Sequence, residues 1–142
     1  MWRKIIMPGL VAGIAMLVTG VSLSWIYNRI FPQLANEYSD EYLFRPWSDP
    51  VMLWFFVHPI AVALLLAWIW DKVKDLFPSV FSSGEKAMRF ALIYSIFSAC
   101  GMLITYSTFP VSLLMVGSWL LSVFIEGIIG TWLLAKLNPS NE

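Results

Sequence analysis

One acidic side chain, Glu126, lies inside a long apolar run near the C-terminal end of the chain. A charged side chain in hydrocarbon costs roughly 2.5 to 3.5 kcal/mol on insertion scales, so an intramembrane carboxyl usually faces protein or water. Ser118, Ser122 and Gly130 share the face of Glu126, because successive members of this set are four residues apart on one predicted helix. These residue types are suited to hold a proton or a cation.

The polar stripe has two interpretations. In the structural one, the hydroxyls and the glycine allow close packing, and Glu126 forms a hydrogen bond across to another helix. In the functional one, Glu126 is a proton or cation site in a transport path. Tyr94, Ser95 and Ser98 of another apolar run lie at a comparable depth when residues are counted from the predicted span ends. We expect Tyr94 or Ser98 to be the partner of Glu126.

His58 is the only histidine, and Pro59 follows it directly. Proline removes a backbone donor and favours a kink, so a titratable ring beside it could form a gate. The simpler interpretation is a neutral His58 that bonds to the carbonyl freed by Pro59, or to the hydroxyl of Thr105 or Ser118. The predicted depths separate His58 from Glu126 by more than about 10 Å, which indicates two sites. The candidate ligand-binding or ion-binding residues are therefore Glu126, Ser122, Ser118, Tyr94, Ser98 and His58.

Four apolar runs must position these residues. They cover about residues 5–27, 51–70, 90–106 and 111–134, and a bilayer core requires about 20 apolar residues per helix. Hydrophobic residues make up 59% of the chain and charged residues 13%, which excludes a water-soluble domain. We predict an all-α polytopic membrane protein, with a single domain over residues 1–142 and four transmembrane helices in an up-down antiparallel bundle.

The lysines and arginines fall unevenly on the two sides of these spans. Seven of the nine lie on one side, and only Arg29 and Arg45 lie on the other. By the positive-inside rule, the N-terminus, the C-terminus and the loop at 71–89 are cytoplasmic, and the loop at 28–50 faces outward.

The outer loop is the one connection with a helical pattern of its own. Leu34, Tyr38 and Tyr42 recur every four residues and have acidic residues between them. This spacing favours a short interfacial helix, with an irregular solvated loop as the alternative.

Local signals predict where the spans begin and end. Ser82 and Glu85 have the spacing of a capping box, and Asp49 with Pro50 is typical of a helix start. Asn138 and Pro139 predict the end of the last span. A turn at Phe109-Pro110 predicts that the last two spans are antiparallel neighbours.

Several function classes are excluded by composition. The formal net charge is zero and no basic run is present, so we expect no nucleic-acid partner. Cys100 is the single cysteine, which excludes an intrachain disulfide. One histidine and one intramembrane carboxyl are too few ligands for a metal or haem centre, and no serine has a base and an acid at a recognisable spacing. We therefore predict neither a cofactor nor an enzymatic activity.

The remaining functions are association and transport. We predict a small integral membrane protein that acts by helix association, as a homo-oligomer or as an accessory subunit of a larger membrane complex. Gly9 with Gly13, and Gly127 with Gly130, predict faces for close helix contact. The alternative is a small transporter or channel for protons, cations or an amphipathic small molecule, with Glu126 as the ionisable site. In both cases we expect the partners to be the lipid bilayer and membrane proteins, in a prokaryotic plasma (inner) membrane.

The layout resembles that of the small multidrug resistance transporters, which have four short helices and one essential intramembrane glutamate. In that family the glutamate lies in the first helix, whereas residues 5–27 of this chain contain none. Dual insertion in that family also requires a weak charge bias, unlike the seven-to-two distribution found in this chain. The resemblance therefore concerns the layout, and what it implies is the transport alternative.

Overall fold

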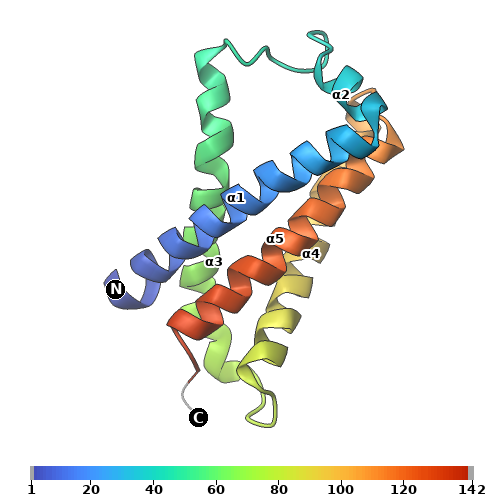
Figure 1. Cartoon of the computed structure of the whole chain (residues 1–142). Helices are drawn as coiled ribbons and strands as arrows, with labels where there is room; N and C mark the ends of the chain where they lie inside the picture. Colours follow the sequence, from blue (N-terminus) through green and yellow to red (C-terminus); the bar gives the residue numbers. More distant parts are fainter. Residues whose placement is uncertain (1, 141–142) are drawn as a thin grey trace.

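The computed structural model describes residues 2–140, and every regular element in this part of the chain is a helix (Figure 1). The long helices are α1 (Met7–Ile30), α3 (Trp54–Val73), α4 (Ser83–Thr108) and α5 (Leu113–Leu137). The short elements are a π-helical turn η1 (Trp2–Ile6), helix α2 (Pro32–Tyr38), and the 3-10 turns η2 (Pro50–Leu53) and η3 (Lys74–Leu76). The prediction of an all-α chain is confirmed.

Four helical ranges of 25 to 29 residues are long and apolar enough to cross a membrane. They are Trp2–Ile30, Pro50–Leu76, Ser83–Thr108 and Leu113–Leu137. The first three contain the predicted spans at 5–27, 51–70 and 90–106, whereas the fourth begins at Leu113, two residues inside the predicted span at 111–134, because Ser112 caps the helix there. All four helices are longer than the apolar runs because they continue into polar residues at their ends. The four helices are compatible with a multi-pass membrane protein.

Side chains predicted to cap the helix starts do so. The Ser82 hydroxyl accepts from the Glu85 amide over 3.3 Å, and the Glu85 carboxylate accepts from the Ser82 amide over 2.7 Å, which completes the capping box before α4. Asp49 accepts from the Val51 amide over 2.9 Å at the start of η2. The Val51 amide and, after it, the Arg45 guanidinium hold the pKa of the Asp49 carboxyl below its usual value.

The long helices form an open layer in the order α3, α1, α5, α4. Helix α1 packs against both α3 and α5, and α4 packs against α5, each pair being antiparallel (Figure 1). The prediction that the last two spans are neighbours is confirmed. Helices α3 and α4 meet near the loop that joins them, where the rings of Trp70 and Phe90 are 5.5 Å apart. The arrangement therefore has two edge helices and is more open than a regular up-down bundle.

The two ends of this layer differ in how tightly they pack. We call the end with residues 2–6 and 138–140 the terminal end, and the end with α2 the loop end. The main buried cluster lies toward the terminal end and includes Ala12, Met16, Ala63, Leu66, Trp70, Phe90 and Leu134. Between α4 and α5, the buried Thr131 hydroxyl lies 2.8 Å from the carbonyl of Gly127 and 3.0 Å from that of Ala87.

Two glycines of α1 form its crossing with α3. A Cβ added at Gly13 would lie 2.8 Å from the Cα of Ile60, and one added at Gly9 would lie 3.0 Å from the Cα of Leu64. Because the opposing atoms belong to the backbone, a side chain at either position would push the two helices apart.

The N-terminal half of α3 leaves the layer (Figure 1). The first buried residue of α3 is Ala63, whereas all residues of Trp54–His58 are exposed. Pro59 stands where α3 separates from α1. Its ring nitrogen cannot donate a hydrogen bond to the preceding turn, so the helix has fewer bonds to resist bending at this point.

Helix α2 is fixed to the start of α5. Leu34 is fully buried in this contact, and the Trp119 indole donates to the Tyr38 hydroxyl over 2.5 Å. Burial raises the pKa of the Tyr38 phenol. The predicted short helix is present, but it ends at Tyr38 and does not reach Tyr42, which is fully exposed. The chain turns instead at Asp40, whose carboxylate accepts from the Tyr42 amide over 2.9 Å.

Asn138 joins three segments of the chain at the terminal end. Its Nδ2 donates to the carbonyl of Lys4 and to the carboxylate of Asp71, each over 3.0 Å. Its Oδ1 accepts from Lys74 over 2.5 Å, and its backbone carbonyl accepts from the Trp70 indole over 2.8 Å. Asn138 and Lys74 are both buried, so these bonds take the place of the hydrogen bonds that solvent would make to the same groups at the surface.

Replacing Asn138 by alanine is expected to lower the free energy of unfolding by about 2–3 kcal/mol, because it removes the side-chain acceptor of the buried Lys74 ammonium and the side-chain donor to the Lys4 carbonyl. Thermal unfolding in an uncharged detergent measures this loss. Asn36→Ala is the matched control, because Asn36 is exposed and its side chain makes no hydrogen bond among residues 2–140. Equal losses in the two variants would contradict the role of Asn138.

Candidate functional site

The packing of α1 against α5 creates the surroundings of Glu126. A Cβ added at Gly20 would lie 2.6 Å from Oε1 of Glu126, so the carboxyl occupies the space that a side chain at Gly20 would need. One turn nearer the terminal end, Met16 contacts Gly130 in the same way, with its sulfur 2.6 Å from the position of an added Cβ. The two contacts share one register of the antiparallel pair: Gly20 is four residues after Met16 on α1, and Glu126 is four residues before Gly130 on α5.

The same register continues the polar stripe of α5 onto α1. Extended by one turn beyond the Glu126 contact, this spacing pairs Ser24 with Ser122, and extended by two turns it pairs Asn28 with Ser118; no hydrogen bond joins either pair within residues 2–140. The side-chain oxygen Oδ1 of Asn28 is buried and has no hydrogen-bond partner within residues 2–140. We call Glu126, Ser122, Ser24, Ser118 and Asn28 the polar strip; it runs from mid-helix toward the loop end.

Tyr94 of α4 lies beside Glu126, at one end of this strip. Its ring packs over Gly127, with Cδ1 3.0 Å from the position of an added Cβ, and its phenol interacts electrostatically with Glu126. Ser98 donates to the backbone carbonyl of Tyr94 over 3.0 Å. No hydrogen bond links Glu126 to Tyr94, to Ser98 or to any other residue from 2 to 140. The predicted partner bond is therefore not formed, although Tyr94 lies beside the carboxyl.

His58 lies apart from this group, on the half of α3 that has left the layer. Its side chain is exposed and makes no hydrogen bond in the described part of the chain. The expected bonds to the freed carbonyl, to Thr105 or to Ser118 are absent; the two hydroxyls instead donate to backbone carbonyls of their own helices, over 3.2 Å and 2.7 Å. No contact joins His58 to Glu126 within residues 2–140, and the predicted separation of the two residues in depth stays a prediction.

Sequence reasoning missed the α1 half of the polar strip. Gly20, Ser24 and Asn28 are four residues apart, which is the spacing that identified Ser118, Ser122 and Glu126 on α5. The spacing was therefore present in the sequence, but it predicts a shared polar strip only once α1 is known to pack against α5. The hydroxyl of Tyr27, beside Asn28, is a second buried oxygen without a partner among residues 2–140.

The chemistry open to this site is the binding of a proton or of a small cation. Over residues 2–140 there is no group of three or more histidine, cysteine or acidic side chains that could hold a metal ion. Cys100 is exposed and unpaired by a disulfide. Comparison of the chain with models of known protein families, with curated protein sequences and with solved structures finds no significant match.

Proposed function

We propose that the protein acts without catalysis, by binding another transmembrane helix along the N-terminal half of α3. The observation that carries this proposal is the exposure of His58 on a helix segment, Trp54–His58, whose residues are all exposed. An apolar surface needs no protein partner, because lipid tails solvate it as well as leucine does. An imidazole within the hydrocarbon region does need a protein partner, because lipid tails offer it no hydrogen bond. His58 is eight residues after Pro50, or about 12 Å along the helix axis, well inside the predicted span.

Two further contacts support a preformed binding surface. Helix α2 is held on α5 by the bond between Tyr38 and Trp119, so residues 39–49 must bridge from α5 to α3. At the loop end of α3, the rings of Phe55 and Trp47 meet edge to face with centroids 5.6 Å apart. Aromatic side chains are enriched in protein interfaces because they supply a large contact area at low entropic cost.

Photocrosslinking in native membranes tests this proposal. In the full chain, a photoreactive amino acid at Val57 is expected to crosslink to protein, and one at Ile104 is not. Val57 is 44% exposed on α3 and Ile104 is 69% exposed on α4, so Ile104 controls for exposure alone. Coexpression of two differently tagged copies distinguishes a homo-oligomer from an accessory subunit, since only the first gives a product with both tags.

A protein crosslink at Val57 that His58→Leu weakens would support the proposal. Lipid adducts alone at Val57, or equal protein crosslinking at Val57 and Ile104, would overturn it.

Transport is the second candidate function, and the surroundings of Glu126 favour it. The Glu126 carboxyl faces Gly20 and has no hydrogen-bond partner among residues 2–140. It lies at one end of a strip of hydroxyl and amide groups, so it is suited to accept a proton or a cation. The strip leads toward the loop end, which gives such an ion one direction of entry. In this function Tyr94 lines the site beside Glu126.

We further propose that the terminal end faces the cytoplasm of a prokaryotic cell, with the protein in its plasma membrane. The seven-to-two distribution of lysine and arginine supports this orientation. The bond between Asn138 and the Lys4 carbonyl supports it as well, because it keeps the two ends of the described chain on one side.

A further inference from the structure

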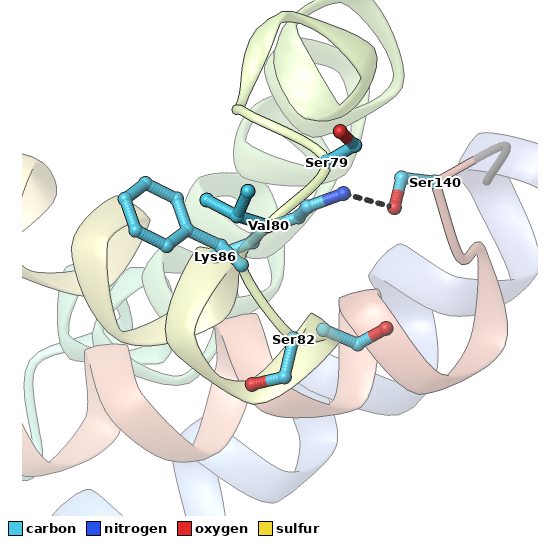
Figure 2. Close-up of a pocket in the computed structure, with 7 residues that line it drawn as sticks. Ser79, Val80, Ser82, Lys86 and Ser140 are labelled. Carbon is cyan, nitrogen blue, oxygen red and sulfur yellow. Dashed lines mark hydrogen bonds between the residues drawn. The ribbon is translucent and has the colours of Figure 1, made fainter.

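A cavity of about 390 Å³ lies at the terminal end of α4. It is bounded by the loop between η3 and α4, by the first turn of α4 and by the segment after α5 (Figure 2). Four serines and a lysine supply its polar lining, which is formed by Ser79, Ser82, Ser83, Ser140 and Lys86.

Lys86 is a buried cation without a counter-ion among residues 2–140. It is only 5% exposed, and Figure 2 shows its ammonium directed at Ser140, to whose hydroxyl it donates over 2.8 Å. No ion pair involves Lys86 in the described part of the chain. A buried ammonium is costly unless an anion or several acceptors compensate it.

Lys74 shows how the same fold treats a second buried lysine. Its side chain is equally inaccessible, but it donates to Asn138 and to the carbonyl of Pro139, and Asp71 lies 3.7 Å away. Lys74 is therefore compensated from within the chain. The contrast indicates that the charge of Lys86 is left for a group from outside.

The other groups around the cavity are donors suited to an oxyanion. The hydroxyls of Ser79 and Ser83 make no hydrogen bond within residues 2–140 and are free to donate. The amides of the first turn of α4 begin a helix, where unpaired N–H groups and the helix dipole favour negative charge. Glu85, the nearest acid in the sequence, is not part of the lining, and its carboxylate is engaged by the amide and hydroxyl of Ser82.

The geometry points to a site for a phosphate group, carried by an anionic lipid headgroup or free in solution, with Lys86 supplying the positive charge. Ammonium, hydroxyl and helix-amide donors arranged around one cavity are the chemistry that recognises phosphate oxygens. The cavity lies where the candidate span Ser83–Thr108 begins, which is the level at which headgroups meet a transmembrane helix. Its volume exceeds that of a single phosphate, leaving room for the ester groups of a phospholipid.

Binding to the full-length protein tests the site with two probes. Nanodiscs of phosphatidylcholine, with and without phosphatidylglycerol, report headgroup binding, and inorganic phosphate titrated into protein in an uncharged detergent reports free phosphate. Lys86→Met is expected to weaken binding of the preferred probe by about tenfold or more, the effect of losing one charge-assisted hydrogen bond. Lys136→Met is the control, because Lys136 is an exposed cation near the same end.

The outcomes distinguish a lipid headgroup from free phosphate, and two of them would show that the site does not exist. Preference for phosphatidylglycerol identifies a lipid site, and phosphate binding without lipid preference identifies a solute site. Binding of neither probe, or equal loss in the Lys86 and Lys136 variants, overturns the proposal. If Lys86→Met does not fold, the double variant Ser79→Ala and Ser83→Ala decides, since neither hydroxyl supports the fold; unchanged binding in that variant overturns the proposal.

Discussion

Replacing Gly13 by leucine is expected to prevent recovery of folded protein, and replacing it by alanine is expected to lower the free energy of unfolding by about 1–3 kcal/mol. A Cβ at this position would lie 2.8 Å from the backbone of Ile60, so a whole helix must move to admit it. Helix α1 cannot simply step back, because its other side is packed on α5 through the contact of Met16 with Gly130. Thermal unfolding and size-exclusion chromatography in detergent measure both variants.

Gly101 provides the matched control for these two variants. It also lies within a long helix, but a Cβ added there meets no atom within 4 Å. Gly101→Ala should therefore be neutral or stabilising by up to about 1 kcal/mol, the helix-propensity difference between the two residues. If Gly13→Ala unfolds at the same temperature as Gly101→Ala, the close approach of α1 to α3 is incorrect.

The sequence identified the helices and several of their ends because those features depend on local chemistry. The capping box of Ser82 and Glu85 and the cap at Asp49 need only residues within one turn of each other. The predicted glycine faces were also informative: Gly9 and Gly13 form the α1–α3 crossing, and Gly130 receives Met16. A glycine pair inside an apolar run indicates close packing against another helix, but it does not identify that helix.

The sequence did not determine which helices pack against each other. In a helix that is apolar around its whole circumference, hydrophobicity does not mark the face that meets a neighbour. Depth counting correctly placed Tyr94 near Glu126, but the facing residue on α1, Gly20, required the order α3, α1, α5, α4. The separation of the first half of α3 from the layer could not be predicted for the same reason, because hydrophobicity does not show which part of an apolar helix meets a neighbour. The sequence identified Pro59 as a place where the helix can bend, but the exposure of Trp54–His58 depends on where the other helices lie.

Replacing Glu126 by glutamine is expected to reduce ion flux by about tenfold or more if the protein transports protons or cations. Glutamine keeps the size of the side chain and its place against Gly20, but it neither exchanges a proton nor carries a negative charge. Proteoliposomes with an imposed membrane potential measure the flux, with a pH-sensitive dye for protons and a sodium-sensitive dye for sodium ions. Glu41→Gln, in the exposed loop, is the control for removing an acid elsewhere.

Gly20→Ala separates a functional Glu126 from a structural one. The added methyl would lie 2.6 Å from Oε1, which is the far end of a flexible side chain, so the carboxyl can move aside at little cost to the fold. A transport site should then lose part of its flux while the unfolding temperature stays near that of the wild type. If Glu126→Gln and Gly20→Ala conduct as the wild type does, Glu126 is not a transport site. If Glu126→Gln instead destabilises the purified protein, the carboxyl serves packing, and helix association is the function that remains.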